Sequence, residues 1–338
     1  MKAIRLTDQD SRVHLDTVAE PAITNPWDVI VRIGGAGLCR TDLHMLDGAV
    51  PGLSLPLTLG HENAGWVTAV GSEVGNVQVG DAVILHPLST CGLCLPCRRG
   101  DDMGCIDHTF TGFHVDGGMA ELLNTSARAV VKLPQGLEPA NVAAHADAGL
   151  TAYHAVKKAL PRLSPDSSAV VVGAGGVGHI AMQCLKAMSP TRVIVVDRRE
   201  VSLELARELG ADDVVLADGS EVDRVLELTD GAGANAVLDC VGEGGAETAA
   251  KAMVGSNGAH YIIGYGATIE VSTLDMVATA QSVIGCRVGS YIDLVELMSL
   301  VSRGHVTLRT DLYPLEAFGD ALSDMRAGRM QGRAVLVP

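Results

Sequence analysis

The chain has 338 residues, 47% of them hydrophobic and only 19% charged, and a formal net charge of −15 at pH 7. This length exceeds what one typical core needs and predicts two domains. The acidic balance argues against nucleic acid or an anionic membrane as a partner. The chain starts Met1-Lys2-Ala3-Ile4, without an apolar export signal, so we expect a cytoplasmic, reducing location.

The N-terminal part, up to about residue 140, contains short apolar segments separated by turns rich in glycine and proline. The clearest of these segments are Val29–Ile33, Gly65–Val70, Ala82–Leu85 and Ala129–Lys132. Short strands with frequent turns are typical of a twisted, mostly-β domain. We therefore expect the chain to begin with such a domain.

Four of the eight cysteines lie in one short segment with the spacing Cys91-x2-Cys94-x2-Cys97-x7-Cys105. Four thiolates this close together match the tetrahedral sulfur site of a structural Zn²⁺ ion. Glycine, proline and charged residues fill the gaps, which indicates a loop that wraps the ion. Buried free thiols or two disulfides are the alternatives, and a reducing location disfavours the disulfides.

From about Leu150 onward, β-branched runs alternate with helix-like segments. The predicted strands are Ala169–Val172, Arg192–Val196, Asp212–Leu216, Asn235–Asp239, His260–Ile263 and Ser282–Gly285. The predicted helices are Gly176–Met188, Arg199–Leu209, Glu221–Leu228 and Ala246–Met253. This alternation predicts a doubly wound parallel sheet with helices on both faces, an α/β fold.

A glycine-rich segment follows the first of these strands and opens a helix. Such a GxGxxG pattern, between a strand and a helix, is the fingerprint of a dinucleotide-binding turn. Its glycines permit the tight turn, the approach of pyrophosphate and the packing of helix on strand, and the helix N-terminus favours the phosphates. The predicted cofactor-binding residues of this turn are Gly173, Gly175, Gly176, Val177 and Gly178.

An acidic residue ends the next strand of this fingerprint. Asp197 follows Val196, at the usual distance from the glycines for a contact with the ribose hydroxyls. Its charge repels a 2′-phosphate, so we expect NAD rather than NADP. Arg198 weakens that preference, because a neighbouring guanidinium accepts the phosphate of NADP. We assign both residues to the cofactor site.

The C-terminal part no longer shows the regular alternation of strands and helices. A helix at Leu294–Ser302 and one near Phe318–Met325 precede a final strand, Arg333–Val337, which we expect to rejoin the N-terminal domain. The predicted limits are therefore 1–147 for the first domain with its cysteine lobe and 148–286 for the dinucleotide-binding domain. Residues 287–338 are predicted to return to the first domain.

Three further segments complete an ordered set of five motifs: Gly37–His44, Gly60–Gly65 and Ala146–Tyr153. Together with the cysteine lobe and the glycine-rich turn, they resemble the zinc-dependent medium-chain alcohol dehydrogenases, most of all bacterial secondary-alcohol dehydrogenases. The resemblance covers essentially the whole chain. It implies a mostly-β GroES-like catalytic domain with an inserted Rossmann domain, and a homo-oligomer.

This resemblance assigns the catalytic zinc ligands to Cys39, His61 and Asp147. The family often has cysteine at the third position, but one thiolate and one carboxylate carry the same charge as two thiolates, and carboxylate oxygen is an established zinc ligand. The rival for that position is His145. Residues two apart on a helix point about 200° away from each other, so both cannot face the metal. The motif alignment favours Asp147.

Two acidic residues are expected to support these ligands. Asp42 has the family position that accepts the second ring N–H of His61. Capping of the short helix after Arg40 is its alternative role. For Glu62 the sequence leaves two roles open: approach to the zinc during ligand exchange, or an anchor outside the ligand shell.

The family resemblance also implies a proton path. Thr41 has the position of the relay hydroxyl, and His44 that of the histidine that passes the proton through the cofactor ribose to solvent. The ordinary pKa of histidine suits this role, although an exposed helix-face histidine is the alternative for His44. Arg40 corresponds to a residue that contacts the cofactor pyrophosphate, with a solvated charge as the alternative.

The expected activity is an NAD-linked, zinc-dependent dehydrogenase that interconverts a small or medium alcohol, secondary alcohols included, and its ketone or aldehyde. Two zinc ions per subunit are expected. Polyol, threonine or aryl-alcohol dehydrogenation in the same superfamily is the alternative, as is a non-catalytic nucleotide-binding relative.

The substrate pocket and the subunit contact are also inferred from this resemblance. Since only 3% of the residues are aromatic, we expect aliphatic side chains around the substrate. His86, Leu46 and Tyr291 are candidate wall residues. The edge strand and the residues after it, 282–291, are expected to pair with a second copy in a dimer or tetramer.

Overall fold

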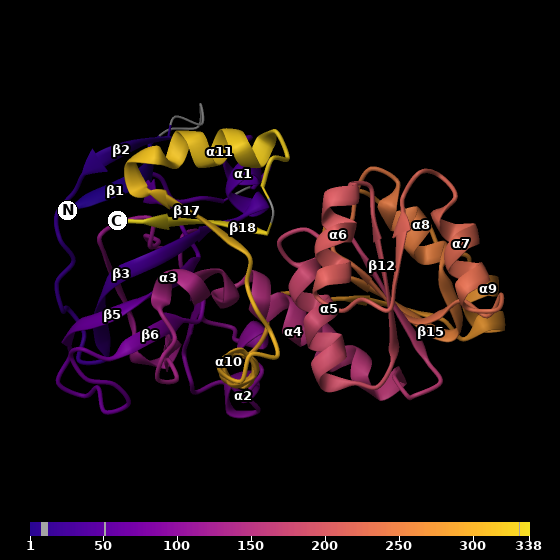
Figure 1. Ribbon diagram of the computed structural model, residues 1–338. Coiled ribbons are helices and arrows are strands. Elements are labelled where there is room, and N and C mark those ends of the chain that lie inside the picture. Colours follow the sequence, from indigo (N-terminus) through magenta and orange to yellow (C-terminus); the bar gives the residue numbers. More distant parts are fainter. Residues whose placement is uncertain (8–12, 51, 331) are drawn as a thin grey trace. The chain divides into compact units, whose positions relative to one another are not determined.

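The computed structural model describes residues 1–7, 13–50, 52–330 and 332–338 (Figure 1). The chain forms two compact units. The first comprises Met1–Leu150, Gly289–Ser302 and Leu308–Pro338, and the second comprises Thr151–Val288 with the short segment Arg303–Thr307. In the described part of the chain, no helix is long and apolar enough to cross a membrane.

The first unit is built on a seven-stranded sheet in which β10, β6, β5, β3, β18 and β17 follow one another and β9 also pairs with β3. Two smaller sheets, β2-β1-β4 and β7-β8, accompany it. The bounds of the large sheet are β3 Asp28–Leu38, β5 Glu62–Val70, β6 Ala82–Leu85, β9 Leu122–Ser126, β10 Val130–Lys132, β17 Thr310–Pro314 and β18 Arg333–Val337. Those of the small sheets are β1 Lys2–Leu6, β2 Val13–Thr17, β4 Leu57–Thr58, β7 Leu88–Thr90 and β8 His108–Phe110.

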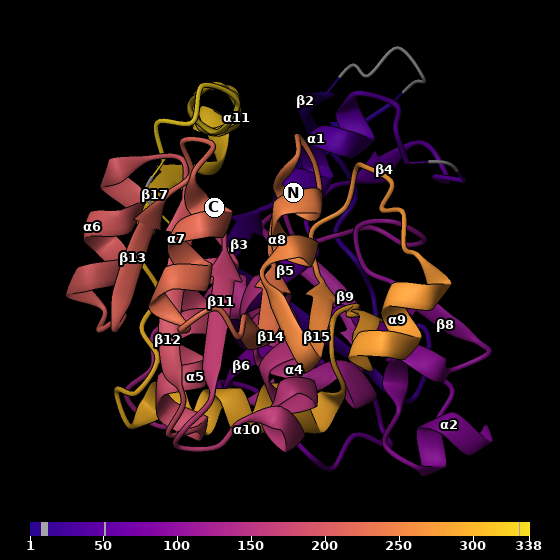
Figure 2. The same ribbon diagram turned by 90° about the vertical axis from the view of Figure 1, so that its right-hand side faces the viewer.

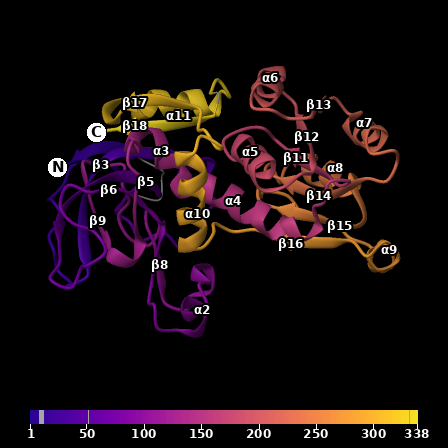
Figure 3. The ribbon, with the colours of Figure 1, turned by 60° about the horizontal axis from the view of Figure 1, so that its bottom comes forward.

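Short helices connect these strands. They are α1 Arg40–Leu46, α2 Leu95–Arg98, α3 Pro139–Val142, α4 Ala148–Ala159, which continues into the second unit, α10 Tyr291–Ser302 and α11 Phe318–Arg326. The loop that carries α2 extends away from strands β3, β5 and β6 in Figure 3. The yellow C-terminal strands lie beside the indigo N-terminal ones in Figure 1, because β18 pairs with β3.

Strand β3 brings distant segments together because it is the longest strand of the sheet and has several partners. It runs antiparallel to β5 up to the pair Gly37–Glu62, and antiparallel to β18 up to the pair Leu38–Ala334. The register shifts between Ile33 and Gly35, a bulge of the kind that redirects a strand near a functional site. The residues that follow β3, precede β5 and begin β18 therefore meet at one end of the sheet.

The second unit is a six-stranded, all-parallel sheet in the order β13-β12-β11-β14-β15-β16 (Figure 2). Its strands are β11 Ser168–Val172, β12 Arg192–Asp197, β13 Asp213–Leu216, β14 Ala234–Asp239, β15 Val254–Ile262 and β16 Ser282–Gly285. Its helices are α5 Gly178–Met188, α6 Glu200–Glu208, α7 Glu221–Leu228, α8 Ala246–Ala252 and α9 Thr273–Thr279. The predicted α/β fold, a mostly-β domain and a doubly wound sheet, is confirmed.

The central strands of this sheet are buried over most of their length, as expected when helices cover both faces. Every residue of β11 is buried. A polar contact explains why Arg303–Thr307 belongs with this unit: the side-chain amide of Gln183 on α5 donates to the Thr307 carbonyl at 2.9 Å and accepts its N–H at 2.9 Å. The predicted domain limits did not include this short return to the second unit.

Candidate functional site

Four potential metal ligands converge at the end of the large sheet. Ligand atoms of Cys39, His61, Glu62 and Asp147 all lie within 4.8 Å of one another. Cys39 follows β3 directly and His61 precedes β5, so the β3–β5 register brings the first two together. Asp147 follows a buried 3₁₀ turn, η3 (Ala143–Ala146), that packs on these strands. His145, the rival ligand, is fully buried but does not belong to this group of converging donors.

The buried imidazole of His61 lies between two carboxylates. Its Nδ1 is 3.6 Å from Asp42 Oδ1 and its Nε2 is 3.6 Å from Asp147 Oδ2. Burial lowers the pKa of His61, but Asp42, together with Cys39 and Asp147, raises it to about 10. Both ring nitrogens are fully buried and make no hydrogen bond in the described part of the chain. Such an orphaned donor set fits a zinc ion at Nε2, with neutral imidazole as the ligand.

Asp42 makes the helix-capping contact that the sequence offered as one of its two roles, and its second carboxylate oxygen faces the predicted ligand His61. Its Oδ2 accepts the Cys39 N–H at 2.8 Å and so fixes the start of α1, while its Oδ1 faces His61. Burial raises the pKa of Asp42, and the nearby imidazole opposes that effect. A carboxylate held in this way orients the ring of a ligand histidine and fixes its tautomer.

Glu62 lies between two other elements at the site. Its Oε1 accepts the Ala148 N–H at 3.1 Å, directly after Asp147, and its Oε2 forms an ion pair with Arg333. Arg333 is only 5% exposed; burial lowers its pKa, but Glu62 and Cys39 raise it above the ordinary arginine value. Arg333 was not among the residues predicted from the sequence. Its signal was a lone cation at the start of an otherwise apolar strand.

Helix α1 carries the three remaining predicted residues of this site. Thr41 is half-buried, and its hydroxyl lies 3.6 Å from the Cys39 sulfur. His44, one turn further along α1, is half-buried, and Arg40 is exposed. The helix therefore places Thr41 against a predicted metal ligand, while the roles of His44 and Arg40 stay predictions.

The candidate wall residues make other contacts. His86 is buried, with Nε2 2.9 Å from the Gly289 carbonyl and Nδ1 accepting the Leu88 N–H at 3.2 Å. Leu46 packs in the hydrophobic core. The Tyr291 hydroxyl donates to the Val130 carbonyl at 3.1 Å.

The four cysteines of the lobe form a second cluster. Sulfur–sulfur distances are 3.4 Å for Cys94–Cys97, 3.6 Å for Cys91–Cys105 and 3.9 Å for Cys91–Cys97. A tetrahedral site with Zn–S bonds of about 2.3 Å requires sulfurs about 3.8 Å apart. Backbone N–H groups of Cys97 and Ile106 lower the pKa of Cys94 to about 6, whereas burial raises that of Cys97 to about 12. All four are free thiols, so the disulfide alternative is wrong and the geometry fits a structural zinc.

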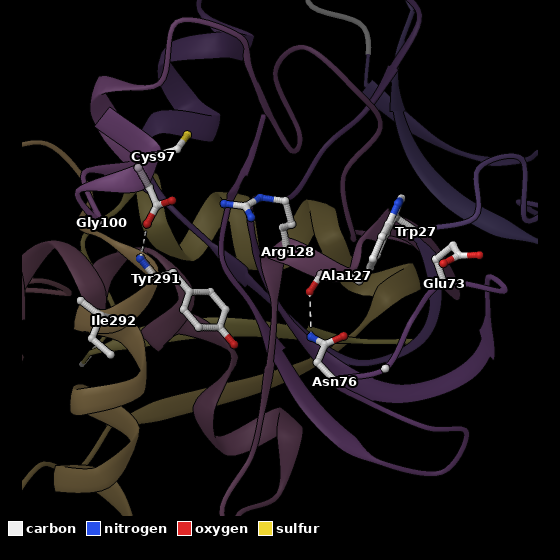
Figure 4. Close-up of a pocket in the computed structure, with 11 residues that line it drawn as sticks. Trp27, Glu73, Asn76, Cys97, Gly100, Ala127, Arg128, Tyr291 and Ile292 are labelled. Carbon is white, nitrogen blue, oxygen red and sulfur yellow. Dashed lines mark hydrogen bonds between the residues drawn. The ribbon is translucent and has the colours of Figure 1, made fainter. Parts of the chain in front are cut away.

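A cavity of about 620 Å³ lies beside this lobe, with Cys97 and Gly100 on its wall (Figure 4). Two hydrogen bonds join residues of its wall: Tyr291 donates its N–H to Asp102 at 2.7 Å, and Asn76 donates to the Ala127 carbonyl at 2.9 Å. None of the converging donors around His61 lines it. The cavity is therefore separate from the candidate metal site.

The glycine-rich turn of the second unit has the geometry that its sequence predicts. Gly173 adopts a left-handed conformation with φ +86°, and a Cβ at Gly178 would overlap the Gly173 carbonyl oxygen. A Cβ at Gly175 would meet open space, so packing within the protein does not explain glycine there. The approach of a phosphate to the backbone does explain it.

Asp197 is held against this turn by two backbone groups. Its Oδ2 accepts the Ala174 N–H and its Oδ1 the Arg199 N–H, both at 2.8 Å. The carboxylate is thereby fixed beside the glycines, where a ribose would lie in a dinucleotide site. Arg198, next along the chain, is exposed.

Two protein-family models match the chain. Residues 25–135 match the alcohol dehydrogenase GroES-like domain, and residues 176–303 match the zinc-binding dehydrogenase domain. An NAD-dependent alcohol dehydrogenase of Sulfurisphaera tokodaii is 32% identical over 350 residues, with 100% of both chains covered. An alcohol dehydrogenase of Geobacillus stearothermophilus is 34% identical over 339 residues, with 99% of each covered.

A solved structure shows the same similarity. The crystal structure of the alcohol dehydrogenase of Aeropyrum pernix superimposes with a TM-score of 0.96 and 42% identity over 100% of both chains. The predicted family and the oxidoreductase class are thereby confirmed. The two matched domains, the relatives and the two donor clusters lead to one conclusion: the chain belongs to the zinc-dependent medium-chain alcohol dehydrogenase family.

Proposed function

We propose that this protein is an NAD-linked alcohol dehydrogenase that interconverts an alcohol and its carbonyl compound by hydride transfer. The observation that carries the proposal is the convergence of Cys39, His61 and Asp147, in which both buried ring nitrogens of His61 lack a hydrogen-bond partner among the described residues. A zinc ion held there supplies Lewis acidity, which favours the ionised form of an alcohol at neutral pH.

The residues around the ligands have separate tasks in this proposal. Asp42 holds the His61 ring so that Nδ1–H faces the Asp42 carboxylate and Nε2 faces Asp147. Thr41, beside the Cys39 sulfur, takes the alcohol proton, and His44 passes it to solvent. Glu62 and Arg333 act as an anchor: the ion pair ties the start of β18 to the turn that carries Asp147.

The charge balance of the site supports the anchor role of Glu62. Cys39, Glu62 and Asp147 place three acidic groups in a buried region. Burial is the largest cause of the raised pKa of Asp147, and the nearby carboxylate of Glu62 raises it further. Arg333 offsets that charge through its contact with Glu62 and its proximity to Cys39. We propose that Glu62 stays paired with Arg333 and does not act as a fourth ligand.

NAD is the proposed cofactor, in keeping with the NAD-dependent relative from Sulfurisphaera tokodaii. The fixed carboxylate of Asp197 favours ribose hydroxyls and repels a 2′-phosphate. An NADP-dependent relative, the D-arabinose 1-dehydrogenase of Saccharolobus solfataricus, is 34% identical over 318 residues, with 92% of this chain and 90% of that protein covered. Preference for NAD therefore needs a direct test.

Asp197→Asn provides that test because it removes the charge and keeps an oxygen for the backbone N–H groups. We expect the ratio of NADP to NAD affinity to rise by at least about tenfold, since like-charge repulsion costs several kcal/mol. Fluorescence titration with both cofactors measures the ratio. The control is Asp212→Asn, whose carboxylate pairs with Lys186 in the same unit. An unchanged ratio in Asp197→Asn would remove this residue from the ribose site.

Cys94→Ser tests the structural zinc. The variant should bind one zinc ion fewer per chain and unfold at a lower temperature, because structural zinc contributes directly to folding free energy. Cys286→Ser, outside both clusters, is the matched control and should keep its zinc. Metal analysis and a thermal melt measure the two effects. An unchanged melting temperature in Cys94→Ser would contradict a structural role for the lobe.

We also propose a homo-oligomer. Strand β16 is an edge of the parallel sheet, and the preceding residues Tyr265, Leu274 and Val277 are exposed. An unpaired edge with apolar side chains nearby is a typical surface for pairing with another chain. Measurement of the native mass tests this proposal, and a monomer at micromolar concentration would refute it.

The central test of function follows NAD⁺ reduction over primary, secondary and benzylic alcohols, polyols and threonine, with zinc content measured in the same sample. Turnover of at least one alcohol class, lost on chelation of zinc, supports the proposal. No turnover of any class by protein holding two zinc ions per chain refutes it.

A further inference from the structure

Two of the three phenylalanines in the chain lie against the imidazole of His61. The ring centroid of Phe113 is 5.5 Å from that of His61, and the ring of Phe110 is 6.1 Å away. The two phenyl rings contact each other edge to face, with centroids 4.6 Å apart. In so aromatic-poor a chain, this pair at a predicted metal ligand is the unexpected feature of the site.

The segment that carries the pair is fixed to the turn that carries His61. The Gly118 N–H donates to the Gly60 carbonyl at 2.9 Å, and the Met119 N–H donates to the Leu59 carbonyl at 2.9 Å. Side chains are excluded at this contact, because a Cβ at Gly112 would come within 2.9 Å of the Gly60 backbone. The aromatic pair therefore has a fixed position relative to the ligand.

Local hydrogen bonds hold Phe110 and Phe113 themselves. The Phe113 N–H donates to the Phe110 carbonyl at 3.2 Å, and the Phe110 N–H donates to His114 Nδ1 at 3.1 Å. Phe113 also packs against the hydrophobic core. Such a wall is preorganised, and little conformational entropy is lost when a ligand packs on it.

The exposure of the site residues shows which side remains accessible. Asp42, His61 and Glu62 are at most 1% exposed, whereas the side chain of Asp147 is 16% exposed. Phe110 and Phe113 are only half-buried. The aromatic pair thus keeps part of its surface uncovered next to the ligand set, where an alcohol would approach.

We propose that Phe110 and Phe113 form an aromatic wall that selects alcohols with an aryl group on the carbinol carbon, and the corresponding aryl ketones. This inference rests on the proposed dehydrogenase function and names its substrate class. A substrate phenyl ring completes an edge-to-face arrangement with the pair, which a saturated ring of the same size does not. A polyol is disfavoured, because phenyl groups offer no hydrogen bonds to its hydroxyl groups once water is displaced.

The test compares 1-phenylethanol with 1-cyclohexylethanol, which have the same carbon skeleton. We expect kcat/KM to favour the phenyl compound by about threefold to tenfold, the usual effect of an aromatic pair beyond its buried area. Phe113→Leu and Phe110→Leu should each reduce this ratio toward one while turnover of the cyclohexyl compound continues. The ratio does not depend on the fraction of protein that folds.

Phe318→Leu is the matched control, because Phe318 is the third phenylalanine and lies in the hydrophobic core. It should keep the ratio of the unmodified protein. A second readout needs no turnover: acetophenone and cyclohexyl methyl ketone are titrated into zinc-loaded protein that holds NAD⁺, which cannot reduce them. Acetophenone should bind more tightly than cyclohexyl methyl ketone, by a factor similar to the ratio of the kcat/KM values.

The outcomes separate the two proposals. A ratio of one or less in the unmodified protein, or a ratio that survives both Phe110→Leu and Phe113→Leu, overturns the aromatic wall while leaving the dehydrogenase intact. An equal loss of the ratio in Phe318→Leu also overturns it. Absence of turnover with every alcohol tested, by zinc-loaded protein, overturns the function itself.

Discussion

Asp147→Ala should lower kcat/KM for alcohol oxidation by at least about 10³-fold, which corresponds to about 4 kcal/mol of lost transition-state stabilisation. The reason is that Asp147 contributes one of the oxygen atoms in the convergent donor set beside His61. The zinc content should fall from about two to about one ion per chain, because a structural site with its own four thiolates is unaffected. Steady-state kinetics and metal analysis measure both effects.

The fold of Asp147→Ala should survive, since the variant removes a carboxylate whose pKa is raised by burial and by Glu62. A cooperative unfolding transition and unchanged NAD binding would show this. His145→Asn is the matched control, because His145 is the buried neighbour that the sequence offered as the rival ligand. It should keep both zinc ions. Loss of zinc in His145→Asn but not in Asp147→Ala would reverse the ligand assignment.

Arg333→Met should destabilise the protein by about 3–5 kcal/mol, the usual cost of leaving one partner of a buried ion pair without the other. Glu62 would remain fully buried beside Cys39 and Asp147 without its ion-pair partner. Denaturant unfolding, followed by a signal from the first unit, measures the loss. Arg333→Lys should recover only part of the stability, because lysine keeps the charge but not the planar guanidinium.

Two controls identify the cause of this destabilisation. The double variant with Glu62→Gln should be more stable than Arg333→Met alone, because the buried charge is then absent. Arg326→Met removes a surface ion pair with Asp47, whose side chains are 52% and 59% exposed, and should cost less than about 1 kcal/mol. Equal destabilisation by Arg326→Met and Arg333→Met would contradict the buried ion pair.

Most of the fold was predictable because its signals are local. Buried strands such as β11 consist of β-branched residues, and the glycine-rich turn and the following acidic residue have a fixed spacing. The cysteine lobe was equally predictable from the sequence, since all four thiols fall within one loop. These features depend on residues near one another in the chain.

The parts that the sequence did not predict depend on long-range pairing. Arg333 lies at the site only because β18 pairs with β3, nearly 300 residues earlier in the chain. Phe110 and Phe113 were missed because low aromatic content suggested an aliphatic pocket, whereas backbone hydrogen bonds to Leu59 and Gly60 hold their segment beside His61. No spacing rule links any of these three residues to the ligand set.

Residue types at short, fixed spacing were enough to predict the family, the order of the two domain types, the cysteine cluster and the candidate ligands. The groups that balance the charge of the buried donors, and those that surround the imidazole, became known from the folded chain alone. The register of β3 with β5 and β18 sets those neighbours, and register results from the packing of the whole sheet.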